Sequence, residues 1–227
     1  MSHDQNAPPE QLGRALDYVR LLRQMRAKIP LYGEETLDEI FRRWKRLRSP
    51  HLTLAPQPHD PTWPQRFARE RERIREALPE QRPVIEHFGS TSIPGLASKL
   101  VIDLAVAVES LDGVEERLVS LGYTAYGNSP VDTETTWLWR TDDQGCVFVA
   151  HLCRQGRPWL QRAIDFRDFL IAHPEEKERY TSLKERLAVE AAGDSLRYSL
   201  GKIELFQEIF TRAAAWRASG APAKEEP

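Results

Sequence analysis

The beginning of the chain has the apolar periodicity of helices. Apolar residues recur every three or four positions over residues 10–48, with a break at Pro30 and Gly33, which predicts two amphipathic helices. Residues 49–64 contain five prolines, and this density disfavours a helix and favours an extended connection. A charged helix with one apolar face is expected next, at about 65–78.

The periodicity changes to that of strands from position 83 onward. The run LVIDLAVAV at 100–108 is almost continuously apolar, as expected for a buried central strand. A shorter strand, VIEHF at 84–88, precedes it, and turn-rich segments separate the later apolar runs. Further strands are predicted at 123–126, 135–140 and 146–152, and helices at about 112–122, 159–172, 174–192 and 195–216.

These elements predict one α+β domain over residues 59–216, in which a mixed sheet is flanked by helices. It would follow a helical N-terminal extension at 1–48 and a Pro-rich linker at 49–58, and precede a disordered tail at 217–227. The helices of the extension are amphipathic, so they should bury their apolar faces on the main domain or on a second subunit. Self-association through the N-terminal helices is therefore one expected outcome.

Composition and charge narrow the class of protein. Of 227 residues, 41% are hydrophobic, which suffices for one core, and no apolar run approaches the roughly 20 residues of a membrane span. Lys and Arg number 32 against 34 Asp and Glu, so no overall basic charge favours nucleic acid. Two cysteines cannot make a disulfide framework, and the first residues lack a signal-peptide pattern. We expect a cytoplasmic protein that binds neither membranes nor nucleic acid.

The most informative stretch joins the first two predicted strands. Gly89 permits a sharp turn after a strand, and Ser90 and Thr91 then offer hydroxyl and backbone N–H groups that suit a phosphate. Asp103 interrupts the buried strand, where a carboxylate is costly unless it is paired, exposed at the rim or bound to a metal. Together they suit a nucleotide that carries Mg²⁺. The alternative is an ordinary turn, with Asp103 capping a neighbouring backbone.

Four other side chains are candidates for contact with an anionic substrate. Lys99 precedes the central strand and would meet a phosphate, and Arg140 at the end of a later strand would bind an anion. Tyr198 and Lys202 are four residues apart and share one face of the last predicted helix, which suits a pair that faces a substrate. Simple solvation is the alternative for each of the cations.

The segment EHFGSTSIPGLASKLVIDLAVAV, residues 86–108, resembles the signature of the GrpB family. This bacterial family has a nucleotidyltransferase-type fold and is also found fused to dephospho-CoA kinase. The resemblance covers about residues 59–216 and leaves 1–58 uncovered. Its other parts are HDPTWPQRFARERERI at 59–74, AHL at 150–152, the run at 166–188, and Tyr198 with Lys202.

The resemblance implies a metal-dependent nucleotidyl transfer, from which this chain departs at one position. Nucleotidyltransferases typically follow the Gly-Ser turn with a strand that bears acid-x-acid, and a third acid from a later strand helps to hold two metal ions. Here Ala105 stands in place of the second acid. His151 would take the place of the third acid, and His87 beside the turn would add a second imidazole.

The ligand set implied in this way is Asp103, His151 and His87. Such a set would hold a divalent metal and would favour Mn²⁺ over Mg²⁺, because imidazole suits transition metals. The absence of any metal site is the alternative.

The function implied is the binding of a nucleotide or phosphorylated cofactor, with transfer of a nucleotidyl group to an unknown small molecule. In this scheme the turn at Gly89 holds a nucleoside triphosphate, and Ser90, Asp103 and His151 are the catalytic candidates. The remaining substrate contacts would come from Thr91, Lys99, Arg140, Tyr198 and Lys202.

Two alternatives stay open from the sequence. A catalytically silent module that binds a ligand or a protein on the same fold is favoured by Ala105, which removes a metal ligand. An ATP-dependent enzyme that activates a small molecule would use the same side chains.

Overall fold

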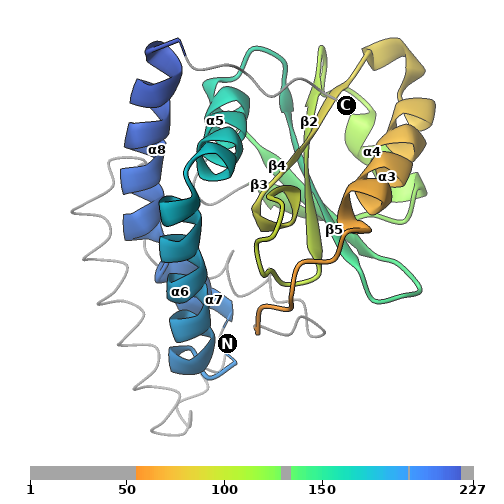
Figure 1. The fold of residues 1–227 in the computed structure, drawn as a ribbon. Coiled ribbons are helices and arrows are strands. Elements are labelled where there is room, and N and C mark those ends of the chain that lie inside the picture. The colour runs from red at the N-terminus through yellow and green to blue at the C-terminus, as the bar shows by residue number, and fades with distance from the viewer. Residues whose placement is uncertain (1–54, 129–133, 194, 221–227) are drawn as a thin grey trace, which may run out of the picture. The chain divides into compact units, whose positions relative to one another are not determined.

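The computed structural model describes residues 55–128, 134–193 and 195–220 (Figure 1). They all belong to one of two compact units of the chain, Ser49–Ser129 with Thr133–Pro227. The two helices predicted within 10–48 lie outside the described residues, as do most of the Pro-rich linker and the end of the predicted tail.

A five-stranded mixed sheet forms the centre of this unit (Figure 1). The strands are β1 (Val84–Phe88), β2 (Val101–Val108), β3 (Thr124–Asn128), β4 (Thr136–Thr141) and β5 (Val147–Arg154). They lie in the order β1-β2-β5-β4-β3, and β2 pairs parallel with β5 while all other neighbours are antiparallel. The central position of β2 explains its nearly unbroken apolar sequence, because both of its faces are covered.

Helices cover both sides of the sheet (Figure 1). α3 (Trp63–Ala77) and α4 (Val114–Ser120) lie on one side, and α5 (Pro158–Ala172), α6 (Pro174–Glu190), α7 (Ser195–Leu200) and α8 (Ile203–Ala218) lie on the other. A short 3₁₀ turn, η2 (Ser90–Ser92), follows β1. The predicted α+β class, with a mixed sheet between helices, is confirmed. None of the described helices is both long and apolar enough to cross a membrane.

Alternation along β2 separates two faces of the sheet. Ile102, Leu104 and Val106 pack in the main hydrophobic core with side chains of α3 and α4. Asp103 and Ala105, which lie between them, therefore point to the opposite face, toward α5 to α8. We call this second face the site face.

A second hydrophobic core joins the segment after η2 to the helical layer. Ile93 and Leu96 are fully buried against side chains of α5, α6 and α8. Burial of a side chain of this size contributes about 1.5–3 kcal/mol. These contacts fix the turn after β1 against the helices of the site face.

The structure differs from the prediction in the last helix. Residues 195–216, predicted as one helix, form α7 and α8 with a break at Gly201 and Lys202. A Cβ atom at Gly201 would lie 3.0 Å from Leu187 Cδ1 and closer still to Cδ2, so α6 packs directly against the break. The apolar periodicity runs on through the break, which is why the sequence predicts a single helix.

Candidate functional site

The turn at Gly89 lies against the carboxylate of Asp103. Gly89 has φ 75° and ψ −173°, a conformation that essentially only glycine adopts. A Cβ atom built there would lie 3.0 Å from Asp103 Cγ and closer still to Oδ2. Glycine is therefore required here both by its backbone and by the close approach of the Asp103 side chain.

Asp103 forms a pair with His151 across the two central strands. Asp103 Oδ1 and His151 Nε2 are 3.2 Å apart. The parallel register places His151 beside Ala105, so both members of the pair point to the site face. The Asp103 side chain is 26% exposed, whereas the His151 side chain is 11% exposed. The carboxylate is thus the member of the pair that a ligand can reach.

Lys99, Lys184 and Lys202 come from separate parts of the chain and lie close enough for their charges to interact, and we call them the lysine cluster. Asp103 acts on two of them, Lys99 and Lys202. The Nζ atoms of Lys99 and Lys202 each lie 4.8 Å from the centre of the Tyr198 ring, as in cation–π contacts. Lys184 of α6 is buried, while Lys99 and Lys202 keep partial contact with solvent. Within the described part of the chain, no carboxylate forms an ion pair with any of the three.

Burial makes the charged forms of the three lysines energetically unfavourable, which lowers their pKa values. Burial, and then the positive charge of Lys99, lowers the pKa of Lys202 from an ordinary value of 10.5 to about 7. Burial also lowers the pKa of Lys184 to about 7, although the charge of Glu185 opposes the change, and the charge of Lys99 adds to it. Burial lowers the pKa of Lys99 to about 8, although the charge of Asp103 opposes the change. A bound anion would favour the charged form of all three lysines and so reduce the cost.

Two of these lysines belong to a repeated Tyr-x-x-x-Lys spacing. Tyr180 precedes Lys184 on α6, and Tyr198 of α7 precedes Lys202. In both pairs the Nζ atom lies over the ring of its own tyrosine, at 4.6 and 4.8 Å from the ring centre. The sequence predicts Tyr198 and Lys202 as site residues but not the first pair, for which the shared spacing is the available signal.

Hydroxyl groups from two elements meet at the turn after β1. The oxygens of the Ser90 and Tyr180 hydroxyls are 3.1 Å apart, which links η2 to α6. Burial raises the pKa of Tyr180, and burial raises the pKa of Tyr198 to about 12, so both phenols stay protonated at neutral pH. Ser90 therefore lies in a hydrogen-bonded position between the turn and the helix that carries Lys184.

Two predicted substrate contacts have other partners in the structure. Thr91 is 1% exposed and donates its hydroxyl to the carbonyl of Val101 at 2.8 Å, so it fastens the turn to β2. Arg140 donates to the buried carboxylate of Glu70 on α3 through Nε and Nη2. The guanidinium of Arg140 is thus engaged on the core side of the sheet, away from the site face.

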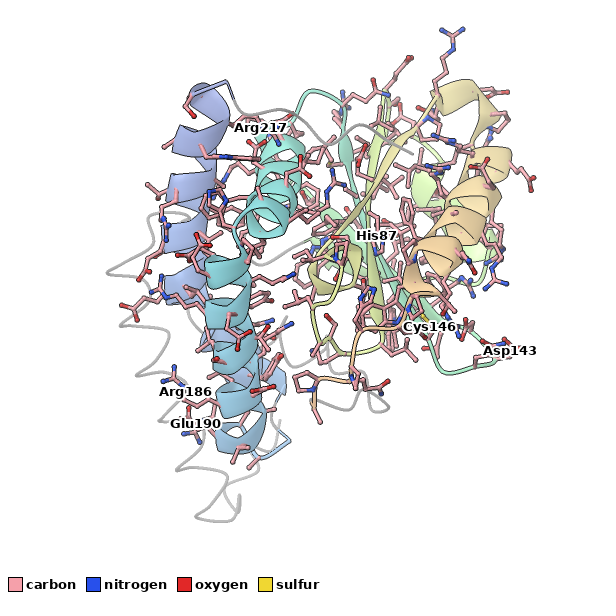
Figure 2. The ribbon with its side chains drawn as sticks, viewed as in Figure 1. His87, Asp143, Cys146, Arg186, Glu190 and Arg217 are labelled. Carbon is pink, nitrogen blue, oxygen red and sulfur yellow. The ribbon has the colours of Figure 1, made fainter. Side chains whose placement is uncertain are left out.

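The strand register places His87, which is labelled in Figure 2, on the opposite face of the sheet from Asp103. It pairs in register with Leu104, and its ring stacks on Phe67 of α3 with the ring centres 4.7 Å apart. The next residue, Phe88, is the one in register with Asp103. Because adjacent strand residues point to opposite faces, His87 and Asp103 cannot share a ligand.

The predicted set of three metal ligands is therefore not assembled. The residues that the structure describes contain no group of three or more His, Cys, Asp or Glu side chains that could hold a metal ion. Asp103 and His151 remain together, and His87 is separated from them by the sheet. Of the three predicted ligands, Asp103 and His151 are the two that could contact one ion.

Restoring the missing second acid tests how polar the site face is. Ala105 is fully buried, and its neighbours in register are Glu86 and His151. Ala105→Asp should lower the free energy of unfolding by about 2 kcal/mol, because the new carboxylate would be desolvated and would lie beside another. Chemical denaturation measures the change. A loss below about 0.5 kcal/mol would show instead that this face accepts a second carboxylate.

The part of the chain that matches known proteins includes every residue of the candidate site. A family model described as GrpB protein matches residues 54–212. A UPF0157 protein of Deinococcus radiodurans is 39% identical over 153 residues, which are 67% of this chain and 78% of that protein. A dephospho-CoA kinase of Mycobacterium bovis is 31% identical over 185 residues, or 70% of this chain. The match spans only 46% of that kinase, and likewise 46% of the UPF0157 protein YqkA of Bacillus subtilis.

A solved structure shares the fold. The crystal structure of the conserved protein GrpB from Enterococcus faecalis has a TM-score of 0.65 and 24% identity, and the match covers 72% of this chain and 99% of that one. The α+β fold expected from the sequence, with a mixed sheet flanked by helices, is confirmed by this likeness and by the strand order. The family model matches well over half of the residues of this chain, so the chain belongs to the GrpB family.

Proposed function

We propose that the chain binds a nucleotide or a phosphorylated cofactor, and that the lysine cluster holds its phosphate groups. The observation that carries this proposal is the gathering of Lys99, Lys184 and Lys202 without an ion-paired carboxylate among the described residues. Such charges destabilise the fold unless a partner compensates them. Phosphate is an anion that several lysine ammonium groups bind together.

The balance of charge favours a ligand with more than one negative charge. Two carboxylates act on the three ammonium groups, Asp103 on Lys99 and Lys202 and Glu185 on Lys184, so the cluster keeps a positive excess. A phosphate monoester carries a charge of about −1.5 to −2 at neutral pH, and a triphosphate carries more. Ser90 adds a hydroxyl, and Asp103 can accept a hydrogen bond from a hydroxyl of the ligand.

One relative supports a ligand of this class. It is named dephospho-CoA kinase, a name that describes phosphorylation of dephospho-CoA. The chain spans less than half of that protein, so the kinase reaction is not assigned to it. The name supports only the class of ligand, a phosphorylated compound.

Binding is better supported than nucleotidyl transfer. Two-metal transfer depends on carboxylates that hold both ions, and Ala105 replaces one of them. The three predicted ligands also lie on two faces of the sheet. Nucleotidyl transfer is therefore the second candidate, whereas a module that binds its ligand without transfer requires only the lysine cluster.

Titration calorimetry with ATP and with tripolyphosphate, without added metal, tests the proposal. Both ligands should bind the wild-type protein. Lys202→Gln should weaken both by at least about tenfold, since a hydrogen bond to a charged group contributes about 1.5–3 kcal/mol. Lys177→Gln is the matched control, because Lys177 lies on α6 and donates to the carbonyl of Pro94 instead. Equal affinities of the wild type and Lys202→Gln would reject the lysine cluster as a phosphate site.

Phosphate binding should weaken as the pH rises. The pKa values of Lys184 and Lys202 are lowered to about 7 and that of Lys99 to about 8, so their charges are lost as the pH goes from about 6 to about 9. At pH 7 a bound phosphate raises these pKa values, and the complex takes up protons. Calorimetry in two buffers of different ionisation enthalpy measures the uptake. Binding without proton uptake at this pH would mean that the phosphate lies elsewhere.

A further inference from the structure

Aromatic side chains from three elements surround His151 on the site face. The ring centres of Phe88 in β1, Trp137 in β4 and Trp159 in α5 lie 4.6, 5.2 and 5.5 Å from that of His151. Trp159 is stacked on the imidazole, and the other two rings meet it edge-on. All three are partly exposed, unlike the main core residues. We call Phe88, Trp137 and Trp159 the aromatic cluster.

The imidazole at the centre of the aromatic cluster lacks one hydrogen bond. His151 is buried, and its Nδ1 atom has no hydrogen-bond partner in the part of the chain that the structure describes. Its Nε2 atom faces the Asp103 carboxylate. Buried polar atoms are almost always paired, so this nitrogen is available to a water or to another polar group.

Asp103 connects the aromatic cluster to the lysine cluster. Its carboxylate is hydrogen-bonded to His151, and its charge acts on Lys99 and Lys202. Trp137 is in register with His151 on the neighbouring strand. With strands spaced about 4.8 Å apart, Trp137 on β4 lies about 10 Å across the sheet from β2. A nucleotide can extend over that distance between its base and its phosphates.

We propose that the aromatic cluster binds the base of a nucleotide whose phosphates lie on the lysine cluster. This inference rests on the proposed function and narrows it, because it selects a nucleotide over a phosphorylated compound without a planar ring. A base stacks on an aromatic side chain whatever its identity, and each such contact improves affinity by roughly fivefold or more. The Asp103 carboxylate, which a ligand can reach, can accept a hydrogen bond from an N–H group of the base.

The test compares ATP with tripolyphosphate, which has the phosphates but no base. Trp159→Leu and Trp137→Leu should each weaken ATP binding by about fivefold or more and leave tripolyphosphate binding within about twofold of the wild type. Lys202→Gln should weaken both ligands. Trp216→Leu is the control, because Trp216 of α8 meets Phe169 of α5 instead, and it should alter neither affinity.

The outcomes separate the base site from the phosphate site. Equal losses for ATP and tripolyphosphate in the tryptophan variants would assign the aromatic cluster to packing, and no loss for either ligand would remove it from the site. Failure of both ligands to bind the wild type would reject the phosphate proposal itself. If a leucine variant does not fold, tryptophan fluorescence of the wild type decides. ATP should quench it and tripolyphosphate should not, and equal responses would overturn the base site.

Discussion

Replacing Lys99 and Lys202 together with methionine should abolish most phosphate binding and make the ligand-free protein more stable. Affinity for ATP and for tripolyphosphate should fall by at least about 100-fold, since two charge-assisted hydrogen bonds of about 1.5–3 kcal/mol each are lost. The Nζ atoms of both lysines lie 4.8 Å from the centre of the Tyr198 ring, and the charge of Lys99 acts on Lys202.

Stability should change in the opposite direction. Burial lowers the pKa of both lysines, and the charge of Lys99 lowers that of Lys202 further, so the charged forms destabilise the folded state. Methionine keeps an unbranched apolar stem of similar length and can still contact the Tyr198 ring. The melting temperature should rise by about 2–4 °C for each kcal/mol gained.

Titrations and calorimetric melts at pH 7 measure the two effects separately. Lys177→Met is the matched control, because its ammonium group bonds to a carbonyl and lies outside the lysine cluster. It should leave the affinity unchanged. A double variant that loses both binding and stability would give Lys99 and Lys202 a structural role, and one that binds normally would reject the phosphate site.

The strands that build the site could be predicted because their signals are local. Residues 84–88 are predicted as a strand and form β1 with the same bounds, and the run at 100–108 differs from β2 by one residue. The sequence also predicts that Gly89 and Asp103 act together, and the structure brings them into contact. A turn after one strand and an acid early in its antiparallel neighbour are necessarily close in space.

The partners of side chains across the sheet could not be predicted in the same way. His87 and Arg140 were expected on the side of Asp103, but both point to the core face, where Phe67 and Glu70 of α3 meet them. The face of a strand residue depends on register, and a shift of one residue reverses it. A strand that is predicted without its neighbouring strand therefore does not show which face of the sheet each side chain occupies.

Lys184 illustrates a second limit of the sequence. It lies within α6, a charged helix, and lysines in charged helices are usually solvated. Lys184 is buried because it packs against the loop that contains Ala97, whose carbonyl it contacts. Helical periodicity alone does not show which charged residue a helix buries. The Tyr-x-x-x-Lys spacing shared with Tyr198 and Lys202 is the only local clue among the described residues.

Gly89→Ala should lower the free energy of unfolding by about 3 kcal/mol or more. The backbone conformation at this position costs about 1–3 kcal/mol for a residue with a side chain. The new Cβ atom would also overlap the carboxylate of Asp103, which lies 3.0 Å away at Cγ. Asp103 would have to move, and its hydrogen bond to His151 would be lost.

Gly95→Ala is the matched control for this variant. Gly95 has φ 74°, close to that of Gly89, but the nearest atom to its Cβ position is Lys177 Nζ at 3.8 Å. It has the backbone strain without the overlap and should cost about 1 kcal/mol. Chemical denaturation measures the free energy of unfolding of both variants, and the difference between their losses gives the contribution of the overlap. Adding Asp103→Ala to Gly89→Ala should recover part of the loss, because the shorter side chain removes the overlap. If Gly89→Ala costs no more than Gly95→Ala, and Asp103→Ala recovers nothing, then the turn and the carboxylate do not touch and cannot form one site.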